Sequence, residues 1–312
     1  MKNIFISIVL FILFCSVIRA QSAGSFTRLG FGARGMGMGN ALTSVTTGEM
    51  SAYYNPALVA FAQQSTGTAT FGILSLDRSL NFLSYVQPIQ PRGGFSAGII
   101  NSGVRNIDGR DNDGYHTDTY STTENQFFFA FANRVSDEVS LGVGVKVYYA
   151  KLFDQVSTTT VGFDVGGLFQ VTPDLSLGAA VKDIGSKYKW DTTPLYGTDG
   201  RQTEDAFPTL SRIALAYTLL SKRAVISAEY ENSSDGGSLF RAGAEYAIVD
   251  HFSLRGGIDR IDFSDNATGA KPSFGFTARS SFGQWTPVLD YAFVVEPFSP
   301  QGMHIISLSL LF

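Results

Sequence analysis

From about residue 66 to its end, the chain alternates between apolar residues and polar or small ones with a period of two. Between positions 141 and 149 the odd positions hold Leu, Val, Val, Val and Tyr, whereas the even positions hold Gly, Gly, Lys and Tyr. Successive side chains of a strand point to opposite faces, so this period predicts strands with one apolar face. We count about fourteen such segments, near 66–75, 79–87, 94–104, 124–134, 139–153, 157–170, 175–183, 209–219, 223–231, 238–248, 252–258, 272–282, 285–294 and 303–312.

The connections between these segments also alternate. Tight turns such as 135–138 and 172–174 follow every second strand, whereas the connections between them include two long polar stretches, 105–123 and 185–208. Short turns on one side, long loops on the other and an even number of strands are typical of bacterial outer-membrane barrels. We therefore predict an all-β protein, a transmembrane antiparallel β-barrel of about 14 strands in the outer membrane, with both termini in the periplasm.

A soluble β-sandwich also alternates, and composition argues against it. Charged residues make up 16% of the chain, against about 25% in soluble domains, and the polar faces of the strands carry mostly Gly, Ala, Ser and Thr. Six aromatic residues fall near the expected strand ends, where membrane interfaces favour them: Tyr148, Tyr149, Trp190, Trp285, Tyr291 and Phe293. The net charge of −4 argues against nucleic acid as a partner.

Some strands carry ionised residues, and their parity puts these on the polar face. A cation facing lipid at mid-depth costs about 2–4 kcal/mol, so we place these side chains in the lumen. They either fill the lumen as cross-strand ion pairs or line a polar conduit that orients a ligand. The predicted lumenal charges are Lys146, Asp164, Arg212, Glu229, Arg241, Glu245, Arg255, Arg279 and Asp290.

The N-terminus reads as an export signal. After Lys2 the chain is almost wholly apolar to Ile18, and Ala20 offers a small residue for cleavage. The only cysteine, Cys15, lies inside this stretch and does not fit a lipid-anchor site. We predict a signal peptide at 1–20, an N-terminal plug at 21–62 with one or two small helices, and the barrel at 63–312.

The plug region is rich in glycine. Gly30, Gly32 and Gly35 match the spacing of a dinucleotide-binding fingerprint, but that motif needs a strand before it and a βαβ unit around it. The pattern downstream is antiparallel, so we reject nucleotide binding. Physically, glycine lets a plug backbone run close to the barrel wall.

The same segment resembles the start of the PorV/PorQ family of outer-membrane proteins, which share the fold of FadL-type transporters. That family has an Ala-Arg-x-x-Gly-Met-Gly stretch, a short helix and an Asn-Pro-Ala element before the first strand. Ala33 opens the first stretch here, and the other plug residues that carry the likeness are Gly32, Arg34, Gly35, Gly37, Gly39, Asn55, Pro56 and Ala57.

The resemblance implies a component of type IX protein secretion or cell-surface attachment. Its expected partners are outer-membrane lipid, translocon or attachment-complex proteins and secreted cargo, contacted through the long loops and the lumen rim. The alternative is a FadL-like transporter of hydrophobic small molecules, which would bind a ligand in the lumen and release it sideways through the wall. Gly93, Gly94 and Gly98 would weaken strand pairing at such an exit.

Within the plug, Arg34 would be an unpaired charge in a narrow lumen. We predict that it pairs with Glu229, Glu245 or Asp290. Asn55 should hydrogen-bond its own backbone in a turn, with Pro56 directing the chain after a short helix. The plug would serve either as a gate or as a cork needed only for stability.

Catalysis finds little support in the sequence. The three histidines, His116, His251 and His304, show no metal-binding spacing, and we expect no metal, no cofactor and no catalytic residue. His116 lies near Asp113 and Asp118 in one loop, without a nucleophile, and a solvated acidic loop explains this cluster better.

Overall fold

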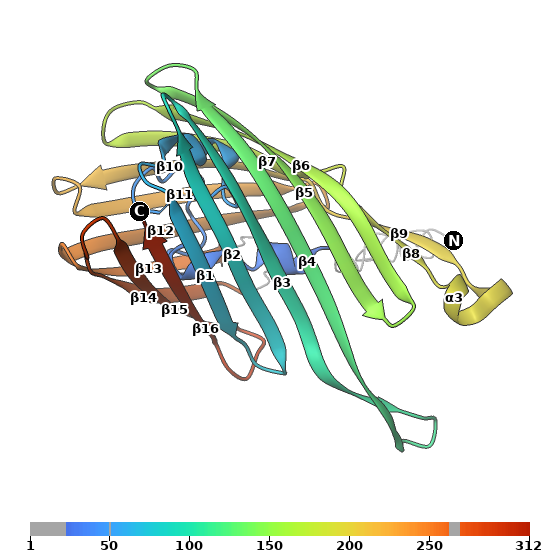
Figure 1. Ribbon diagram of the computed structural model, residues 1–312. Helices are drawn as coiled ribbons and strands as arrows, with labels where there is room; N and C mark the ends of the chain where they lie inside the picture. Colours follow the sequence, from blue (N-terminus) through green and yellow to red (C-terminus); the bar gives the residue numbers. More distant parts are fainter. Residues whose placement is uncertain (1–22, 50, 262–268) are drawn as a thin grey trace, which may run out of the picture.

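The computed structural model describes residues 23–49, 51–261 and 269–312, so the predicted signal peptide lies outside the described residues. Fourteen strands form one closed barrel in the order β1-β16-β15-β14-β13-β12-β11-β10-β7-β6-β5-β4-β3-β2 (Figure 1). These strands are β1 (Thr66–Ile73), β2 (Arg78–Ile89), β3 (Gly93–Arg110), β4 (His116–Arg134), β5 (Val139–Phe153), β6 (Val156–Gln170), β7 (Leu175–Ile184), β10 (Leu210–Leu219), β11 (Ala224–Ser233), β12 (Gly237–Val249), β13 (Phe252–Ile261), β14 (Lys271–Arg279), β15 (Thr286–Val294) and β16 (Met303–Leu311).

Each barrel strand coincides with one predicted segment, and β1 closes the sheet by pairing antiparallel with β16, Thr66 opposite Leu311. The predicted fold class is therefore confirmed. A second element was not predicted: β8 (Lys187–Asp191) and β9 (Gln202–Ala206) form a separate hairpin between β7 and β10, with α3 (Thr193–Tyr196) and η3 (Gly197–Asp199) at its tip.

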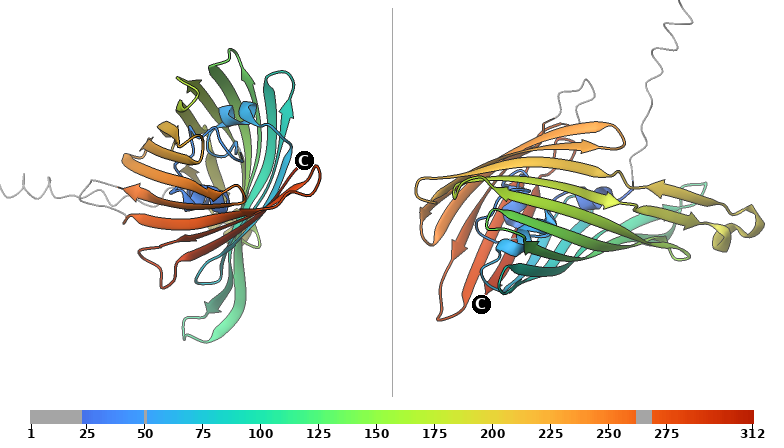
Figure 2. Two further views of the ribbon diagram at one scale, coloured as in Figure 1. Left: turned by 90° about the vertical axis from the view of Figure 1, so that its left-hand side faces the viewer. Right: turned by 90° about the horizontal axis from the view of Figure 1, so that it is seen from above.

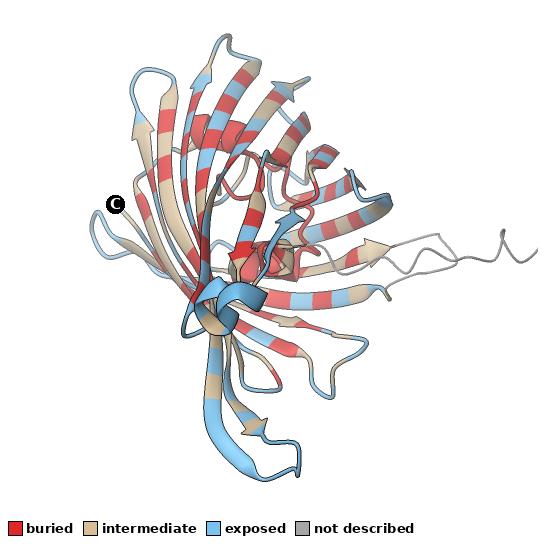
Figure 3. Cartoon of the chain, turned by 90° about the vertical axis from the view of Figure 1, so that its right-hand side faces the viewer, coloured by how far each residue is buried: buried red, intermediate tan, exposed pale blue. Residues whose placement is uncertain are grey.

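The alternation along the strands sorts side chains between lumen and exterior, as the banded colouring of Figure 3 shows. On β4, Phe127, Phe129 and Phe131 are exposed, while Phe128 and Ala130 are buried. Apolar side chains on other strands are exposed in the same way, among them Phe71, Leu83, Val143, Phe163, Ile213 and Leu254. An apolar exterior on a closed sheet belongs to a membrane-spanning barrel, because closure pairs every backbone group.

No helix in the described part of the chain is long and apolar enough to cross a membrane.

The two ends of the barrel differ. We call the end with the connections after β2, β4, β6, β10, β12 and β14 the short-turn end, and the opposite end the hairpin end. The predicted loop 105–123 is mostly strand, because β3 and β4 continue beyond the barrel as a long ribbon and turn only between Arg110 and His116 (Figure 1). The stretch 185–208 is likewise not an irregular loop, since it contains β8 and β9.

The aromatic prediction was partly wrong. Tyr149 and Trp285 are exposed on the exterior, but Tyr148 is fully buried in the lumen because its parity is that of Lys146. Trp190 lies on β8, outside the barrel sheet, where its ring packs against Tyr188 at 5.2 Å. Membrane interfaces therefore do not account for these two rings.

The N-terminal segment fills the barrel, as Figure 2 shows in blue. It comprises three short helical elements, η1 (Ser25–Arg28), α2 (Gly32–Gly37) and η2 (Pro56–Phe61), joined by turns. We refer to residues 23–62 as the plug. Much of the plug is buried, including Phe31, Met36, Tyr54 and Leu58.

The plug enters from the end opposite the C-terminus. The ring of Phe207, which follows β9 at the hairpin end, lies 2.0 Å from where a Cβ on Gly24 would be, whereas Phe312 pairs with Ser65 at the short-turn end. The first described residues and the C-terminus therefore lie at opposite ends of the barrel, while the predicted mature N-terminus falls outside the described residues. An even strand count places the two ends of the barrel sheet together, but the plug runs the length of the lumen before β1 begins.

Candidate functional site

Arg34 links the plug to the barrel wall. Its Nε and Nη2 donate to the two carboxylate oxygens of Glu245 on β12, at 3.1 and 3.0 Å, in a two-pronged ion pair. Its Nη1 donates to the backbone oxygens of Thr47 and Glu49, at 2.8 and 3.2 Å. Glu245 is one of the three carboxylates named from the sequence. Arg34 thus connects helix α2, the later plug turn and the wall.

The electrostatics keep Arg34 charged. Burial lowers the pKa of the guanidinium, but the Glu245 carboxylate opposes this strongly and the net pKa lies above the usual value. Glu49 behaves differently, because burial and the nearby Asp290 carboxylate raise its pKa to about 7, against the opposing effect of Arg34. The plug therefore contains a permanent cation and an acid that titrates near neutral pH.

The Asn-Pro-Ala element anchors the plug to the opposite side of the lumen. Asn55 caps η2, its Oδ1 accepting from the N–H of Ala57 at 2.9 Å, which is the local turn expected from the sequence. Pro56 is the first residue of η2 and comes after the short helix α2 in the chain. Ala57 accepts a hydrogen bond from Ser140 Oγ of β5 at 2.8 Å.

Asn55 also holds the wall itself. Its Nδ2 lies 3.1 Å from the carbonyl oxygen of Gly167 on β6 and 3.4 Å from that of Ala179 on β7, residues that face each other across the ladder. The neighbouring Gly166 has no room for a side chain, because a Cβ there would lie 2.0 Å from Asn55 Oδ1. Glycine in the wall thus permits the plug to make direct backbone contact.

The plug glycines lie along α2 and the turn after it. Gly32, Gly35 and Gly37 belong to α2, and Gly39 follows it with a positive φ of 60°. A Cβ on Gly39 would stand 2.5 Å from the backbone nitrogen of Ile258 on β13. This position needs glycine both for its conformation and for its contact with the wall.

One half of the inner wall carries buried charges, which we call the charged wall. All of its members are buried except the half-buried Glu245, and they are inward-facing residues on β5–β7, β10–β13 and β15: Lys146, Asp164, Lys182, Asp183, Arg212, Glu229, Glu231, Arg241, Glu245, Arg255, Asp259 and Asp290. Eight of these are among the nine lumenal charges predicted from parity. The remaining one, Arg279, has the parity of the buried Thr277 but is exposed at the last position of β14, at the rim of the barrel.

The charged wall is held by three groups of ion pairs. Lys146 Nζ lies 2.8 Å from both Asp164 and Asp183. Arg212 and Arg241 share Glu229 and Glu231, with the shortest contact, 2.6 Å, between Arg212 and Glu231. These networks bridge neighbouring strands and rigidify the wall. Removing one partner would leave a buried charge uncompensated, so each pair holds its strands in place.

The third group lies beside α2. Arg255 contacts Asp290 at 2.8 Å and Glu245 at 3.2 Å. Arg241 joins this side of the wall to the second group through Asp259 at 2.6 Å. Arg34 of the plug completes the group, so the plug and five strands, β10–β13 and β15, share one electrostatic network.

Four members of the charged wall were not predicted. Glu231 and Asp259 have the same parity as Glu229 and Arg255, so the alternation could have found them. Lys182 and Asp183 are consecutive yet both buried, because a β-bulge shifts the β6–β7 register and Asp183 has a positive φ of 61°. The ammonium of Lys182 lies 4.0 Å from the centre of the Tyr53 ring in the plug.

The other half of the inner wall is apolar. We call it the apolar wall; it comprises Leu80, Phe82 and Val86 of β2, Ile100 of β3, Phe128, Ala130 and Ala132 of β4, and Met303 and Ile305 of β16. The plug ring of Phe31 packs between Phe82 and Phe128, at centroid distances of 4.9 and 5.7 Å, and against Tyr53 at 5.3 Å. Together with Lys182, these rings form a row across the lumen.

Inside the lumen, two cavities of about 10 and 40 Å³ lie between the plug and the wall. A polar vestibule of about 440 Å³ opens at the short-turn end beside Thr46, Arg134 and Lys222. In this conformation the plug occupies the space that a lumenal ligand would need.

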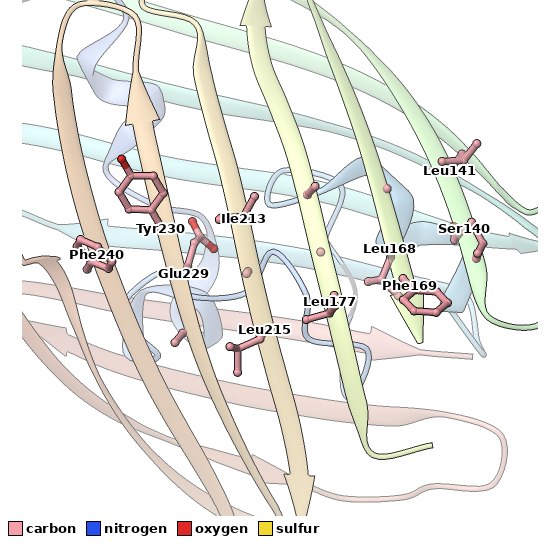
Figure 4. A pocket seen from close by; sticks show the side chains of 16 residues that line it. Ser140, Leu141, Leu168, Phe169, Leu177, Ile213, Leu215, Glu229, Tyr230 and Phe240 are labelled. Atoms are coloured by element: carbon pink, nitrogen blue, oxygen red, sulfur yellow. The ribbon is translucent and has the colours of Figure 1, made fainter. Parts of the chain in front are cut away.

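A larger groove, of about 700 Å³, lies on the exterior. Figure 4 shows side chains of its rim, including Leu141, Leu177, Ile213 and Leu215, on β5, β7 and β10. Its walls are almost wholly apolar and face the bilayer. The groove is therefore a lipid-facing surface and not a lumenal site.

The predicted weak point at β3 is not present. The ladders that join β3 to β2 and to β4 run without interruption from Gly93 to Val104, through Gly94 and Gly98. The sideways exit inferred from these glycines was therefore wrong for this conformation.

No described cluster of three or more His, Cys, Asp or Glu side chains is placed to hold a metal ion. His116 lies at the exposed tip of the β3–β4 ribbon, where its Nδ1 is 2.6 Å from Asp108 rather than beside Asp113 or Asp118. His304 pairs with Tyr291 at 2.7 Å on the exposed face.

No protein-family model matches the chain, and no curated protein matches it either. Solved structures match over nearly the whole length. The toluene transporter TbuX of Ralstonia pickettii is 15% identical with a TM-score of 0.63, covering 90% of this chain and 98% of TbuX. The monoaromatic hydrocarbon channel CymD is 13% identical (TM-score 0.64; 91% and 97% covered), and a FadL homologue of Pseudomonas aeruginosa is 14% identical (TM-score 0.61; 90% and 98% covered). The chain therefore has a FadL-like barrel fold.

Proposed function

We propose that this protein is a non-enzymatic outer-membrane barrel that admits hydrophobic small molecules, and that its plug is the gate. The observation that carries this proposal is the position of Phe31, a plug ring seated on the apolar wall between Phe82 and Phe128. The likeness to a toluene transporter and a monoaromatic hydrocarbon channel supports the same class of cargo.

Apolar cargo would open the gate by replacing the contacts that Phe31 makes with the apolar wall. A buried aromatic ring contributes a large apolar contact area, so the plug cannot leave the apolar wall without exposing that surface. An incoming aromatic molecule restores the lost contacts as it displaces Phe31. The opening is therefore favoured by apolar cargo and disfavoured for water and ions.

The two halves of the lumen have separate tasks under this proposal. The ion pairs of the charged wall hold the barrel shape and anchor Arg34, while the apolar wall takes the cargo. The short-turn end would face the periplasm and the hairpin end the exterior, as is usual for such barrels.

The test is uptake of labelled toluene by outer-membrane-intact cells that express the chain. Expression should raise uptake above that of cells with an empty vector, and Phe31→Ala should raise it further, several-fold, because the apolar wall is then partly uncovered. Phe129→Ala is the matched control, since this ring faces lipid. Toluene uptake equal to that of the empty-vector cells would refute the proposal.

A second candidate function is a role in type IX secretion or surface attachment. The plug sequence that resembles the PorV/PorQ family favours this role. Two residues of that sequence, Arg34 and Asn55, fix the plug on opposite sides of the lumen. The exposed β3–β4 ribbon and β8–β9 hairpin would then contact translocon proteins or cargo. Deletion of the gene should block release of cargo that carries a C-terminal secretion signal, and unchanged release would exclude this role.

A further inference from the structure

Gln126 is a fully buried amide with no polar contact. It points inward from β4, with Ile100 of β3 and Tyr148 of β5 as its neighbours in the sheet. Neither its Oε1 nor its Nε2 has a hydrogen-bond partner among the described residues. A buried amide without a partner is destabilising, and most buried polar groups in proteins are paired.

The surroundings of Gln126 are aromatic. The ring of Tyr148 packs on Phe207 at 4.6 Å, and Phe207 packs on Tyr188 of β8 at 4.8 Å, so the β8–β9 hairpin covers this part of the wall. Toward the short-turn end, the next inward side chain of β4 is Phe128, which contacts the plug ring of Phe31. The amide thus lies beside the part of the apolar wall where the proposed cargo would displace Phe31.

Negative charge borders the site. Glu124, the next inward residue of β4 toward the hairpin end, accepts a hydrogen bond from Tyr188 at 3.3 Å. Tyr148 donates a hydrogen bond to Asp183. Asp183 is paired with Lys146, whereas Glu124 lies beside the amide and disfavours an anionic ligand, for which the neutral Gln126 supplies no compensating charge.

We propose that Gln126 is the polar contact of a binding site for neutral aromatic molecules that carry one hydrogen-bonding group, such as phenols or aromatic alcohols. The ring of the ligand replaces Phe31 on the apolar wall, and its hydroxyl pairs with the amide. This inference rests on the proposed function and narrows its substrate class, because a plain hydrocarbon leaves the amide unpaired.

The experiment compares p-cresol with toluene, which differ by one hydroxyl group. Binding of each is measured by titration calorimetry on the full barrel in lipid nanodiscs, with empty nanodiscs subtracted. After correction for the different partitioning of the two compounds into lipid, the wild type should bind p-cresol about three- to ten-fold more tightly than toluene. This ratio corresponds to the free energy of one hydrogen bond. Gln126→Leu should abolish this preference while toluene binding stays the same or improves.

Ser96→Ala is the matched control. Ser96 is also buried and without a hydrogen-bond partner, but it lies near the short-turn end of β3, and its replacement should leave the preference unchanged. Gln126→Met serves as a second variant if the leucine variant does not fold, as judged by heat-modifiable migration on gels.

The outcomes separate the two proposals. If the wild type binds neither compound, the transport proposal and this inference both fail. If toluene binds but the p-cresol preference survives in the Gln126 variants, the transport proposal stands and the role of Gln126 is refuted.

Discussion

Asn55 of the plug donates a hydrogen bond to the carbonyl oxygen of Gly167 in strand β6, across 3.1 Å. The same side chain caps η2 and reaches the backbone oxygen of Thr43 at 2.9 Å. One amide therefore joins two plug segments and the barrel wall, although it is separated from Gly167 by more than a hundred residues of sequence.

Replacing Asn55 with alanine should loosen the plug without opening the barrel sheet. The loss of the cap and of the wall contact is expected to cost about 1–3 kcal/mol. Amide hydrogen exchange should rise in η2 while the ladder between β6 and β7 remains protected. Asn232→Ala, at an exposed side chain of β11, is the control. Equal protection of η2 in the variant and the wild type would contradict the assigned role.

Arg34→Met should destabilise the protein strongly. The substitution removes one of the two arginine partners of Glu245 and leaves only Arg255. Breaking a buried ion pair typically costs about 3–5 kcal/mol. Arg110→Met removes an exposed pair with Asp108 at the ribbon tip and should change stability by less than about 1 kcal/mol. Urea unfolding midpoints in detergent compare the two, and similar midpoints would show that the plug contact is not stabilising.

The plug should become less stable as the pH rises toward neutrality. The pKa of Glu49 is about 7 in the folded protein and near 4.5 when the chain is unfolded, so the folded state retains a proton that the unfolded state has lost. Stability should therefore decline between about pH 4.5 and 7 and then level off.

Glu49→Gln tests this directly, since it removes the titrating group. It should flatten the decline and stabilise the protein at pH 8 by roughly 1–3 kcal/mol. Glu204→Gln, on the exposed hairpin, should keep the wild-type profile. A Glu49→Gln variant that retains the full pH dependence would assign the titration to another group.

The exterior of β4 should reject charge. Phe129→Arg places a cation on the lipid-facing side and is expected to cost about 2–4 kcal/mol at mid-depth, measured by reversible folding into lipid vesicles. Tyr115→Arg, at the ribbon tip between β3 and β4, should be nearly neutral. If both variants behaved alike, the exterior of β4 would not be in contact with hydrocarbon.

Strand parity predicted the barrel well. It gave the strand number, the exposed phenylalanines of β4 and most of the charged wall, because each strand has a period of two that lipid enforces on one face. It failed at Asp183, where a bulge turns two consecutive side chains inward. Parity gives the direction of a side chain but not its depth along the barrel, so it did not predict that Arg279 is exposed at the end of β14.

The plug and the hairpin were less accessible to sequence reasoning. Glycine spacing indicated a plug, and Arg34 was expected to find a carboxylate, but its partner depends on how the plug runs through the lumen. In the β8–β9 hairpin, β9 is exposed throughout and lacks the one-sided apolar pattern that reveals a strand, and the alternation of β8 covers only five residues. The aromatic row from Phe82 to Tyr53 depends on residues brought together only by closure of the barrel.

The central claim is that the plug must move for apolar cargo to pass. The backbone N–H of Ala33 donates to Ser307 Oγ of β16 at 2.8 Å, so cysteines at these two positions can tether α2 to the wall. The only native cysteine is Cys15, in the predicted signal peptide. With the Ala33→Cys, Ser307→Cys pair oxidised, toluene uptake should fall to the empty-vector level and recover on reduction. Uptake that is equally fast in the oxidised and reduced forms would contradict the account.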